Sequence, residues 1–197
     1  MKFKIFGVKI YVSFLFAAVV AFMIATDRTG LILPTLFAVT IHEGGHLFAM
    51  WLVGCQPKSV RLLPATVQIT RKMATKKGGE LIVCAFGPAC NLFMFGLLYL
   101  NYSLYKSNTS LYLALLNLIV CLYNLLPVKG LDGGTLLKAV LEQFLNERKT
   151  NIVLATVSLS LAGIITFFGV YLTLCGRLNL SVFIVAAYIV VVTVMKM

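Results

Sequence analysis

Six apolar segments separated by short polar stretches fill most of this chain of 197 residues. Most of them are close to the roughly 20 residues that a helix needs to cross a bilayer. An open strand would leave its backbone polar groups unsatisfied in lipid, so each segment is predicted to be a transmembrane helix. The expected fold is an all-α polytopic membrane protein with about six transmembrane helices, at approximately residues 8–26, 31–54, 80–102, 109–126, 151–175 and 179–195.

Two stretches between the apolar segments differ from simple loops. Residues 57–78 are basic, but Ser59–Thr70 carries β-branched and apolar residues on both sides of Pro64. This pattern predicts a short hairpin or a re-entrant segment at the cytoplasmic face. Leu131–Leu145 is amphipathic, and it is predicted to lie along the membrane interface. Ordinary solvated loops are the alternative for both stretches.

The composition agrees with a membrane protein. Hydrophobic residues make up 60% of the chain and charged residues 12%, whereas a soluble domain has about 25% charged residues. No long polar region is available for a separate soluble domain, so residues 1–197 are predicted to form one membrane-embedded domain in the lipid bilayer. The five cysteines are odd in number and include no CxxC pair, so we expect them to act as small hydrophobic residues.

The net charge of +11 is better explained by membrane topology than by nucleic acid. The basic residues stand between apolar segments and are not interleaved with aromatic residues on one basic face, so no nucleic-acid partner is expected. With the N-terminus in the cytoplasm, all but three of the 17 lysines and arginines lie inside, the exceptions being Arg28, Lys106 and Arg177. This distribution predicts a multi-pass protein of the cell membrane with both termini cytoplasmic. No small-residue cleavage site precedes Asp27, so the first apolar segment is predicted to be retained rather than removed as a signal peptide.

The second apolar segment contains the motif HExxH, formed by His42, Glu43 and His46. On a helix, positions i and i+4 lie one turn apart on the same face, so both imidazoles can reach one tetrahedral metal. Glu43 lies beside them, where a carboxylate can take a proton from a water molecule at that metal. These are the only two histidines of the chain, and ionisable groups inside a membrane indicate a functional site. The alternative is a buried His–Glu cluster that holds helices together.

Two histidines leave a catalytic zinc site one protein ligand short, and the remaining candidates are carboxylates or thiolates. Asp27 and Glu80 flank apolar segments, and Glu142 and Glu147 lie in a polar stretch. Asp132 directly follows the fourth segment, in the sequence NLLPVKGLDGG. The second and fourth segments both run from outside to inside, so Asp132 can meet the histidines from the cytoplasmic side. An Asp-Gly turn is the alternative for this residue.

The pairing of HExxH in one span with NxxPxxxLDGG after a later span resembles the site-2 protease family of M50-type intramembrane metalloproteases. The resemblance covers about residues 31–134, the expected catalytic core, followed by C-terminal helices at residues 151–195. It implies a zinc ion held by His42, His46 and Asp132, with Glu43 activating water. In this family the asparagine of the second motif, here Asn124, helps to bind the substrate or the oxyanion. The six-span layout is similar to the sporulation-type bacterial branch, without a PDZ or CBS domain.

The third apolar segment carries the sequence Gly87-Pro88-Ala89-Cys90-Asn91. A proline inside a span removes a backbone hydrogen bond, and an amide side chain is polar in lipid. Asn91 is expected to face the site and bind the substrate backbone, because the pattern resembles a Gly-Pro-x-x-Asn sequence frequent in the family. An interhelical hydrogen bond is the alternative.

The resemblance implies hydrolysis of peptide bonds in transmembrane or membrane-tethered protein substrates. Glu43 is the expected general base, and Asn124 is expected to stabilise the developing oxyanion. The β-like stretch at Val60–Ile69, near the active site, is expected to receive an unwound substrate by strand addition. One alternative function is a metal transporter or channel, which the clustering of the ionisable groups at one depth disfavours. Another is an inactive pseudoprotease scaffold, which the complete set of expected catalytic residues disfavours.

Overall fold

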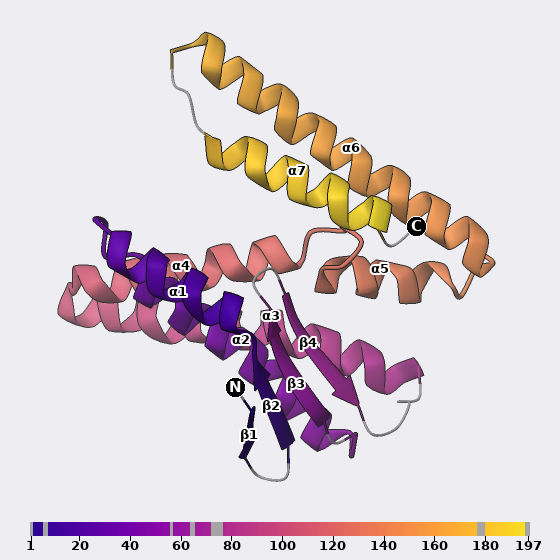
Figure 1. The fold of residues 1–197 in the computed structure, drawn as a ribbon, viewed down its shortest axis with the longest axis horizontal. Helices are drawn as coiled ribbons and strands as arrows, with labels where there is room; N and C mark the ends of the chain where they lie inside the picture. The colour runs from indigo at the N-terminus through magenta and orange to yellow at the C-terminus, as the bar shows by residue number, and fades with distance from the viewer. Residues whose placement is uncertain are drawn as a thin grey trace. The chain divides into compact units, whose positions relative to one another are not determined.

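The computed structural model describes residues 2–5, 8–55, 57–63, 66–71, 77–176 and 180–195 (Figure 1). The chain forms two compact units, Met1–Cys121 and Leu122–Met197. The boundary between them falls near the end of helix α4, which spans Asn108–Asn124. Helices dominate, as the sequence predicts, but a four-stranded sheet is also present. The prediction of a single domain over the whole chain stays a prediction.

The first unit is built around two long antiparallel helices, α2 and α3, which pack on each other. They coincide with the second and third predicted segments and leave a small buried cluster between them, formed by Ala49, Met50 and Val83. Helices α1 and α4 complete the helical part of this unit. The bounds are Phe14–Thr26 for α1, Ile32–Leu52 for α2 and Lys77–Tyr105 for α3.

The sheet of the first unit has the strand order β1-β2-β3-β4 (Figure 1). Strands β1 and β2 are antiparallel, β2 and β3 are parallel, and β3 and β4 are antiparallel. The predicted hairpin between α2 and α3 is confirmed as β3 and β4. The strands span Lys2–Ile5, Val8–Val12, Pro57–Leu63 and Thr66–Arg71.

The prediction that the first transmembrane helix begins at residue 8 is wrong. Residues 8–12 form strand β2, and only residues 14–26 are helical. This short segment is rich in β-branched and aromatic residues, which favour strands, and it pairs in parallel with β3 from Lys9 opposite Ser59 to Val12 opposite Leu62. The remaining helix of 13 residues is roughly 20 Å long, less than the thickness of a hydrocarbon core.

The second unit contains helices α5, α6 and α7, with α6 and α7 lying side by side (Figure 1). Its core consists of Val128, Leu131, Ala162 and Ile189, each 9% exposed or less. The predicted amphipathic stretch at residues 131–145 is helical over α5, and the last two predicted segments correspond to α6 and α7. The bounds are Asp132–Leu141, Glu147–Leu174 and Leu180–Met195.

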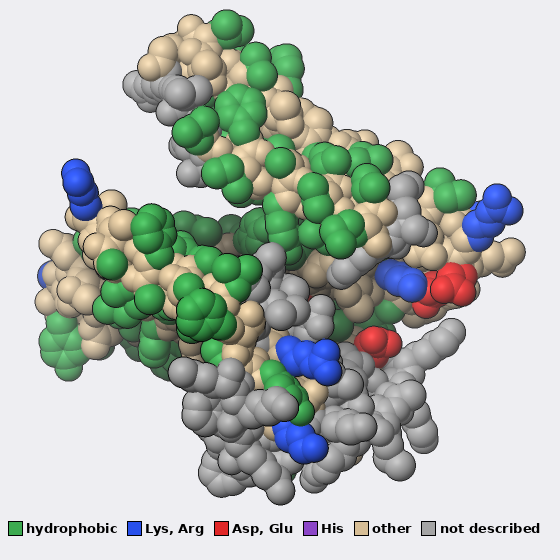
Figure 2. Space-filling model, viewed as in Figure 1, with side chains coloured by type: hydrophobic (Ala, Val, Ile, Leu, Met, Phe, Trp, Pro, Cys, Tyr) green, Lys and Arg blue, Asp and Glu red, His purple; other side chains and the backbone are tan. Residues whose placement is uncertain are grey.

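Among the described residues, two helices are long and apolar enough to cross a membrane, namely Gly78–Tyr105 and Glu147–Leu174. Only 28% of the most apolar stretch of each is buried in the protein, whereas a core helix of a soluble protein would be mostly covered. Large apolar side chains such as Phe93 and Phe167 lie exposed on these helices. Figure 2 shows apolar side chains spread over the helices of both units, with charged groups near helix ends and over the sheet. A bilayer provides the apolar surroundings that such surfaces need.

A polar turn at Asp27 joins α1 to α2. The backbone N–H of Ile32 and the hydroxyl of Thr29 both donate to its carboxylate, at 2.9 and 2.7 Å. These hydrogen bonds, that of Ile32 most, lower the pKa of Asp27 to about 2. The carboxylate is therefore ionised at physiological pH and accepts from the N–H groups that precede and open α2, which have no helical partner of their own.

Gly45 allows the close contact between α2 and α3. A Cβ atom at this position would lie 2.6 Å from the carbonyl oxygen of Phe86 and 3.0 Å from the sulfur of Cys90. The adjacent Gly44 is exposed, and a Cβ there would meet nothing within 4 Å. The two neighbouring glycines therefore differ in their packing, and only Gly45 sets the distance between the helices.

We expect Gly45→Ala to lower the free energy of unfolding by about 1–3 kcal/mol, because the added methyl group forces α2 away from a backbone carbonyl. Gly44→Ala is the matched control, and it should leave stability unchanged or raise it by up to about 1 kcal/mol through its better helix propensity. Equilibrium unfolding in detergent, followed by circular dichroism, measures both values. Equal effects of the two substitutions would contradict the packing described for Gly45.

Candidate metal centre

Helix α2 presents His42 and His46 on its buried face. The buried residues of α2 follow the helical period, at Ala38, His42, Gly45, His46, Ala49 and Met50. The two imidazoles are 4% and 8% exposed, and their rings meet edge to face with centroids 4.7 Å apart. The predicted i, i+4 arrangement on one face of a helix is therefore confirmed.

A backbone carbonyl of α3 determines which ring nitrogen of His46 carries the hydrogen. Its Nδ1 atom lies 2.8 Å from the carbonyl oxygen of Val83, and because a carbonyl can only accept, Nδ1 must donate. Nε2 of the neutral ring consequently carries the lone pair.

Three buried contacts of an amide side chain determine in the same way which ring nitrogen of His42 carries the hydrogen. Its Nδ1 atom lies 3.0 Å from Oδ1 of Asn91, whose Nδ2 donates to the carbonyl of Ala38 and to Oδ1 of Asn117. Asn117 in turn donates from its own Nδ2 to the carbonyl of Leu113 at 2.8 Å. Since both carbonyls only accept, Asn91 must turn its oxygen to His42. His42 therefore donates from Nδ1 and holds its lone pair on Nε2.

The two Nε2 atoms lie 3.2 Å apart. When both Nδ1 atoms carry the hydrogen of a neutral ring, neither Nε2 atom has one to share, and two lone pairs at this distance repel each other. A cation between them removes the repulsion. In tetrahedral coordination, with each nitrogen about 2.0–2.1 Å from zinc, the two nitrogens are about 3.3 Å apart. The donor pair of α2 thus fits a zinc ion in both chemistry and spacing.

Gly87 makes room for the two imidazoles on the side of α3. A Cβ atom at this position would lie 2.5 Å from Cε1 and Nε2 of His46 and 2.9 Å from Cε1 of His42. Any other residue at position 87 would displace the ring edges, which carry the lone pairs. Gly87 of the Gly-Pro pair in the third segment therefore makes room for both histidines directly.

In the second unit, Asp132 is the first residue of α5, so the alternative of an Asp-Gly turn is wrong. Gly133 and Gly134 follow it and are buried, and a Cβ atom on either would collide with the backbone of the preceding loop, at Leu125 or Val128. The N–H of Lys129 donates to the hydroxyl of Ser158 on α6 at 3.0 Å, which anchors this loop. The LDGG sequence thus holds a carboxylate at the first turn of a helix, where the helix dipole favours negative charge.

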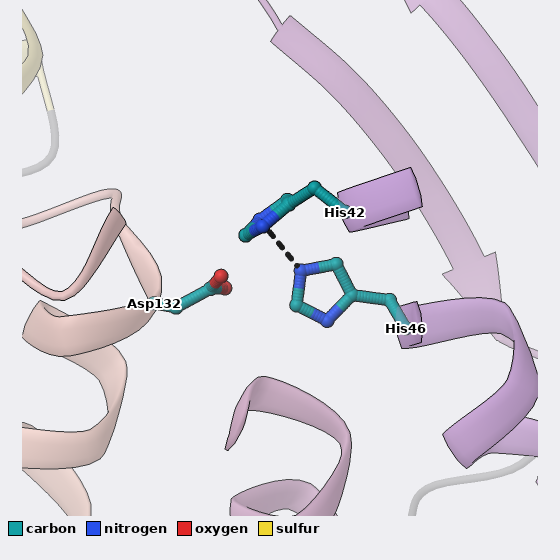
Figure 3. Close-up of side chains that lie close together, drawn as sticks. All are labelled: His42, His46 and Asp132. Atoms are coloured by element: carbon teal, nitrogen blue, oxygen red, sulfur yellow. Dashed lines mark hydrogen bonds between the residues drawn. The ribbon is translucent and has the colours of Figure 1, made fainter. Parts of the chain in front are cut away.

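Of the remaining predicted site residues, Glu43 is half-buried on α2 between the two histidines in sequence, and Asn124 is the last residue of α4. Contact of Asn91 with a substrate backbone stays a prediction, while the alternative of an interhelical hydrogen bond is confirmed. Asn117 is not among the predicted site residues, although an amide within an apolar segment is a signal in the sequence. Figure 3 labels His42 and His46, on α2 of the first unit, and Asp132, at the start of α5 of the second; among the described residues these imidazole and carboxylate groups are of the kinds that can hold a metal ion.

Comparison with known proteins connects these residues to one family. Residues 15–131 match the family model described as Peptidase M50B-like, and residues 103–165 match that of Peptidase family M50. Zinc metalloprotease MJ0392 of Methanocaldococcus jannaschii is 30% identical over 181 residues, which cover 85% of this chain and 52% of that protein. The chain therefore spans about half the length of this curated relative. A solved structure of a site-2 protease from the same organism shares the fold, with a TM-score of 0.72, 24% identity, and coverage of 99% of this chain and 94% of the other.

We expect Gly87→Ala to weaken zinc binding by about 10- to 100-fold, the range seen when groups that orient metal ligands are lost. Its methyl group would displace the ring of His46 from the position that faces His42. Gly96→Ala on the same helix is the control, because a Cβ at Gly96 meets nothing within 4 Å. Competition with a chromophoric chelator measures both affinities. Unchanged zinc affinity in Gly87→Ala would refute the placement of the imidazoles against α3.

Proposed function

Because this chain belongs to the site-2 protease family, with an M50B-like match over residues 15–131, we propose that it is an intramembrane zinc metalloprotease. The observation that carries the proposal is the pair of converging Nε2 lone pairs on His42 and His46. A structural role for the pair would place a hydrogen between the two nitrogens. The acceptors on both Nδ1 atoms instead favour a metal ion.

Asp132 is the proposed third ligand. Catalytic zinc sites use three protein ligands and keep a fourth position open, and two histidines with one carboxylate are a known set. Asp132 is held at the start of α5 by the buried glycines that follow it. The polar atoms of the two imidazoles and this carboxylate are of the kinds that zinc binds.

Zinc, when bound, supplies a Lewis acid that polarises the scissile carbonyl and lowers the pKa of water. Glu43 is the proposed general base, since it follows His42 directly on α2 and is only half-buried. Its carboxylate would take a proton from the attacking water and pass it to the leaving amine. The side-chain amide of Asn124 would donate a hydrogen bond to the developing oxyanion.

The proposed surroundings are a cell membrane, crossed several times. The two long apolar helices, α3 and α6, support at least part of this arrangement. The distribution of lysine and arginine supports placing both termini in the cytoplasm. In that orientation, the loop before Asp132 and the sheet both face the cytoplasm.

The proposed substrate is a transmembrane or membrane-tethered protein that unwinds locally before cleavage. Strand β4 pairs with β3 on one side, and it is the last strand in the order of the sheet as described. An edge strand presents backbone donors and acceptors to an extended peptide. We therefore propose that the substrate adds to β4 as a fifth strand, which would extend its peptide bonds for hydrolysis.

We expect wild-type protein to hold about one zinc ion per chain, and Asp132→Ala and His46→Ala to lose it. Glu43→Gln should keep the zinc but lower cleavage by about 10²- to 10⁴-fold, because it lacks only the base. Elemental analysis of the purified proteins gives the metal content. Cleavage can be scored by size on a co-expressed panel of single-span membrane proteins.

Zinc retained by Asp132→Ala would move the third ligand to another residue and break the link between the two motifs. Cleavage that persists in Glu43→Gln would refute the assignment of the base. Because Glu43→Gln differs from the wild type only in an amide for a carboxylate, its retained zinc content also serves as the control for folding.

Strand addition to β4 can be tested with two proline substitutions at neighbouring positions, Val67→Pro and Gln68→Pro. Along a strand, successive N–H groups point alternately to the two sides, so one substitution removes an N–H that faces β3 and the other an N–H at the open edge. We expect the variant that loses the edge donor to keep its zinc content and unfolding temperature but to cleave membrane substrates at least about tenfold more slowly. Normal cleavage in both variants would exclude β4 as the docking strand.

A further inference from the structure

Asn117 lies on α4, away from either sequence motif, yet it is fully buried. Both ends of its side-chain amide are engaged in hydrogen bonds. Nδ2 donates to the carbonyl oxygen of Leu113 at 2.8 Å, and Oδ1 accepts from Nδ2 of Asn91 at 2.9 Å. Through Asn91, this amide is two hydrogen bonds away from Nδ1 of His42.

Backbone carbonyls determine the direction of every hydrogen bond in this series of amides. The carbonyl of Leu113 accepts only, so Asn117 must turn its nitrogen to Leu113 and its oxygen to Asn91. Asn91 must then offer a hydrogen to Asn117 and a second one to the carbonyl of Ala38 at 3.0 Å. Both hydrogens of its nitrogen are thereby held, and its oxygen is left to accept from His42.

The two acceptors of Asn91 come from different helices. Ala38 belongs to α2, the same helix as His42, whereas Asn117 belongs to α4. Ala38 alone would set which end of the amide faces His42 but would leave one hydrogen of Nδ2 without a partner in a fully buried position. Such unpaired groups are costly in protein interiors, so the amide would turn or shift to find another acceptor. Asn117 prevents this movement.

We propose that Asn117 is a positioning residue for the metal centre, which acts through Asn91 to keep the hydrogen of His42 on Nδ1 and the lone pair on Nε2. The inference rests on the proposed zinc site, since it gives the fixed lone pair its purpose. It assigns a part in positioning the site to a residue of α4 that lies outside both HExxH and NxxPxxxLDGG. Asn117 touches no ligand atom and no substrate in this scheme.

The first test measures zinc affinity, by chelator competition, in a cycle of Asn117→Leu, Asn91→Leu and the double variant. Loss of Asn91 should weaken binding by about 10- to 100-fold, and loss of Asn117, one bond further from the metal, by about three- to tenfold. Since Asn117 acts only through Asn91, the double variant should bind zinc no more weakly than Asn91→Leu alone. Independent structural effects of the two asparagines would instead multiply.

Asn101→Leu is the matched control. Asn101 on α3 accepts a hydrogen bond from the hydroxyl of Ser110 on α4 at 2.8 Å, so this variant also breaks a contact between the same two helices. It leaves the amides at Asn91 and Asn117 intact. Its zinc affinity should equal that of the wild type, which separates loss of helix contact from loss of the amide chain.

The second test needs no metal. The chain has only two histidines, so ¹⁵N spectra of the metal-free protein with labelled histidine resolve both rings at a pH where they are neutral. His42 should carry its hydrogen on Nδ1 in the wild type and in Asn101→Leu. In Asn117→Leu, a fraction of His42 should carry it on Nε2, while His46, held by the carbonyl of Val83, should not change.

The outcomes distinguish the inference from the proposed function. A wild type that binds no zinc would refute the proposed function, whereas the spectra would still report on the amide chain. Zinc binding that is normal in Asn117→Leu, together with an unchanged His42 spectrum, would overturn the inference and leave the protease assignment intact. A double variant weaker than Asn91→Leu by the full effect of Asn117→Leu would also overturn it.

Discussion

The candidate metal centre depends on one constraint, namely that two imidazoles one helical turn apart must both turn a lone pair to the same point. Left to itself, a neutral pair at 3.2 Å would place a hydrogen on one Nε2 atom and accept it with the other. The carbonyl of Val83 and the amide oxygen of Asn91 prevent this, because each takes the hydrogen of one ring at Nδ1. Neutral rings in this arrangement repel unless a cation lies between them, so the acceptors of the second helix leave a pair of histidines suited to hold a metal ion.

Helix α3 can supply these acceptors only because it approaches α2 closely. The approach requires glycine on both sides, at Gly45 against the carbonyl of Phe86 and at Gly87 against the rings themselves. Glycines lower helix propensity, but at these two positions the lost side chains are the ones that would have separated the helices. The β3–β4 hairpin connects the end of α2 to the start of α3. The segment that allows α3 to pack on α2 therefore also contains β4, the last strand in the order of the described sheet.

The parts of the site that depend on local geometry could be predicted from the sequence. HExxH fixes the histidines to one face by helix period alone, and the β-branched residues around Pro64 indicated the hairpin. The strand at residues 8–12 could not be separated from the apolar segment that follows it, because its partner, β3, lies about 50 residues further along the chain. Likewise, the sequence left Asp132 open between a turn and a ligand. The backbone carbonyls of Leu125 and Val128 pack against the buried glycines at the start of α5, a contact made only in the folded chain.

The asparagines show most clearly what sequence alone lacks. An amide in an apolar helix, such as Asn91, indicates a buried polar contact, but the sequence does not say which end of the amide meets which neighbour. The orientation of each amide follows from groups that can only accept a hydrogen bond. Here these groups are the backbone carbonyls of Ala38 and Leu113, two residues whose type gives no sign of this role. A chain of amides that begins and ends on backbone carbonyls has one consistent set of directions, and it passes that direction across three helices to His42. The backbone therefore decides which ring nitrogen of His42, the proposed metal ligand, carries the hydrogen, and Asn91 and Asn117 form the connection.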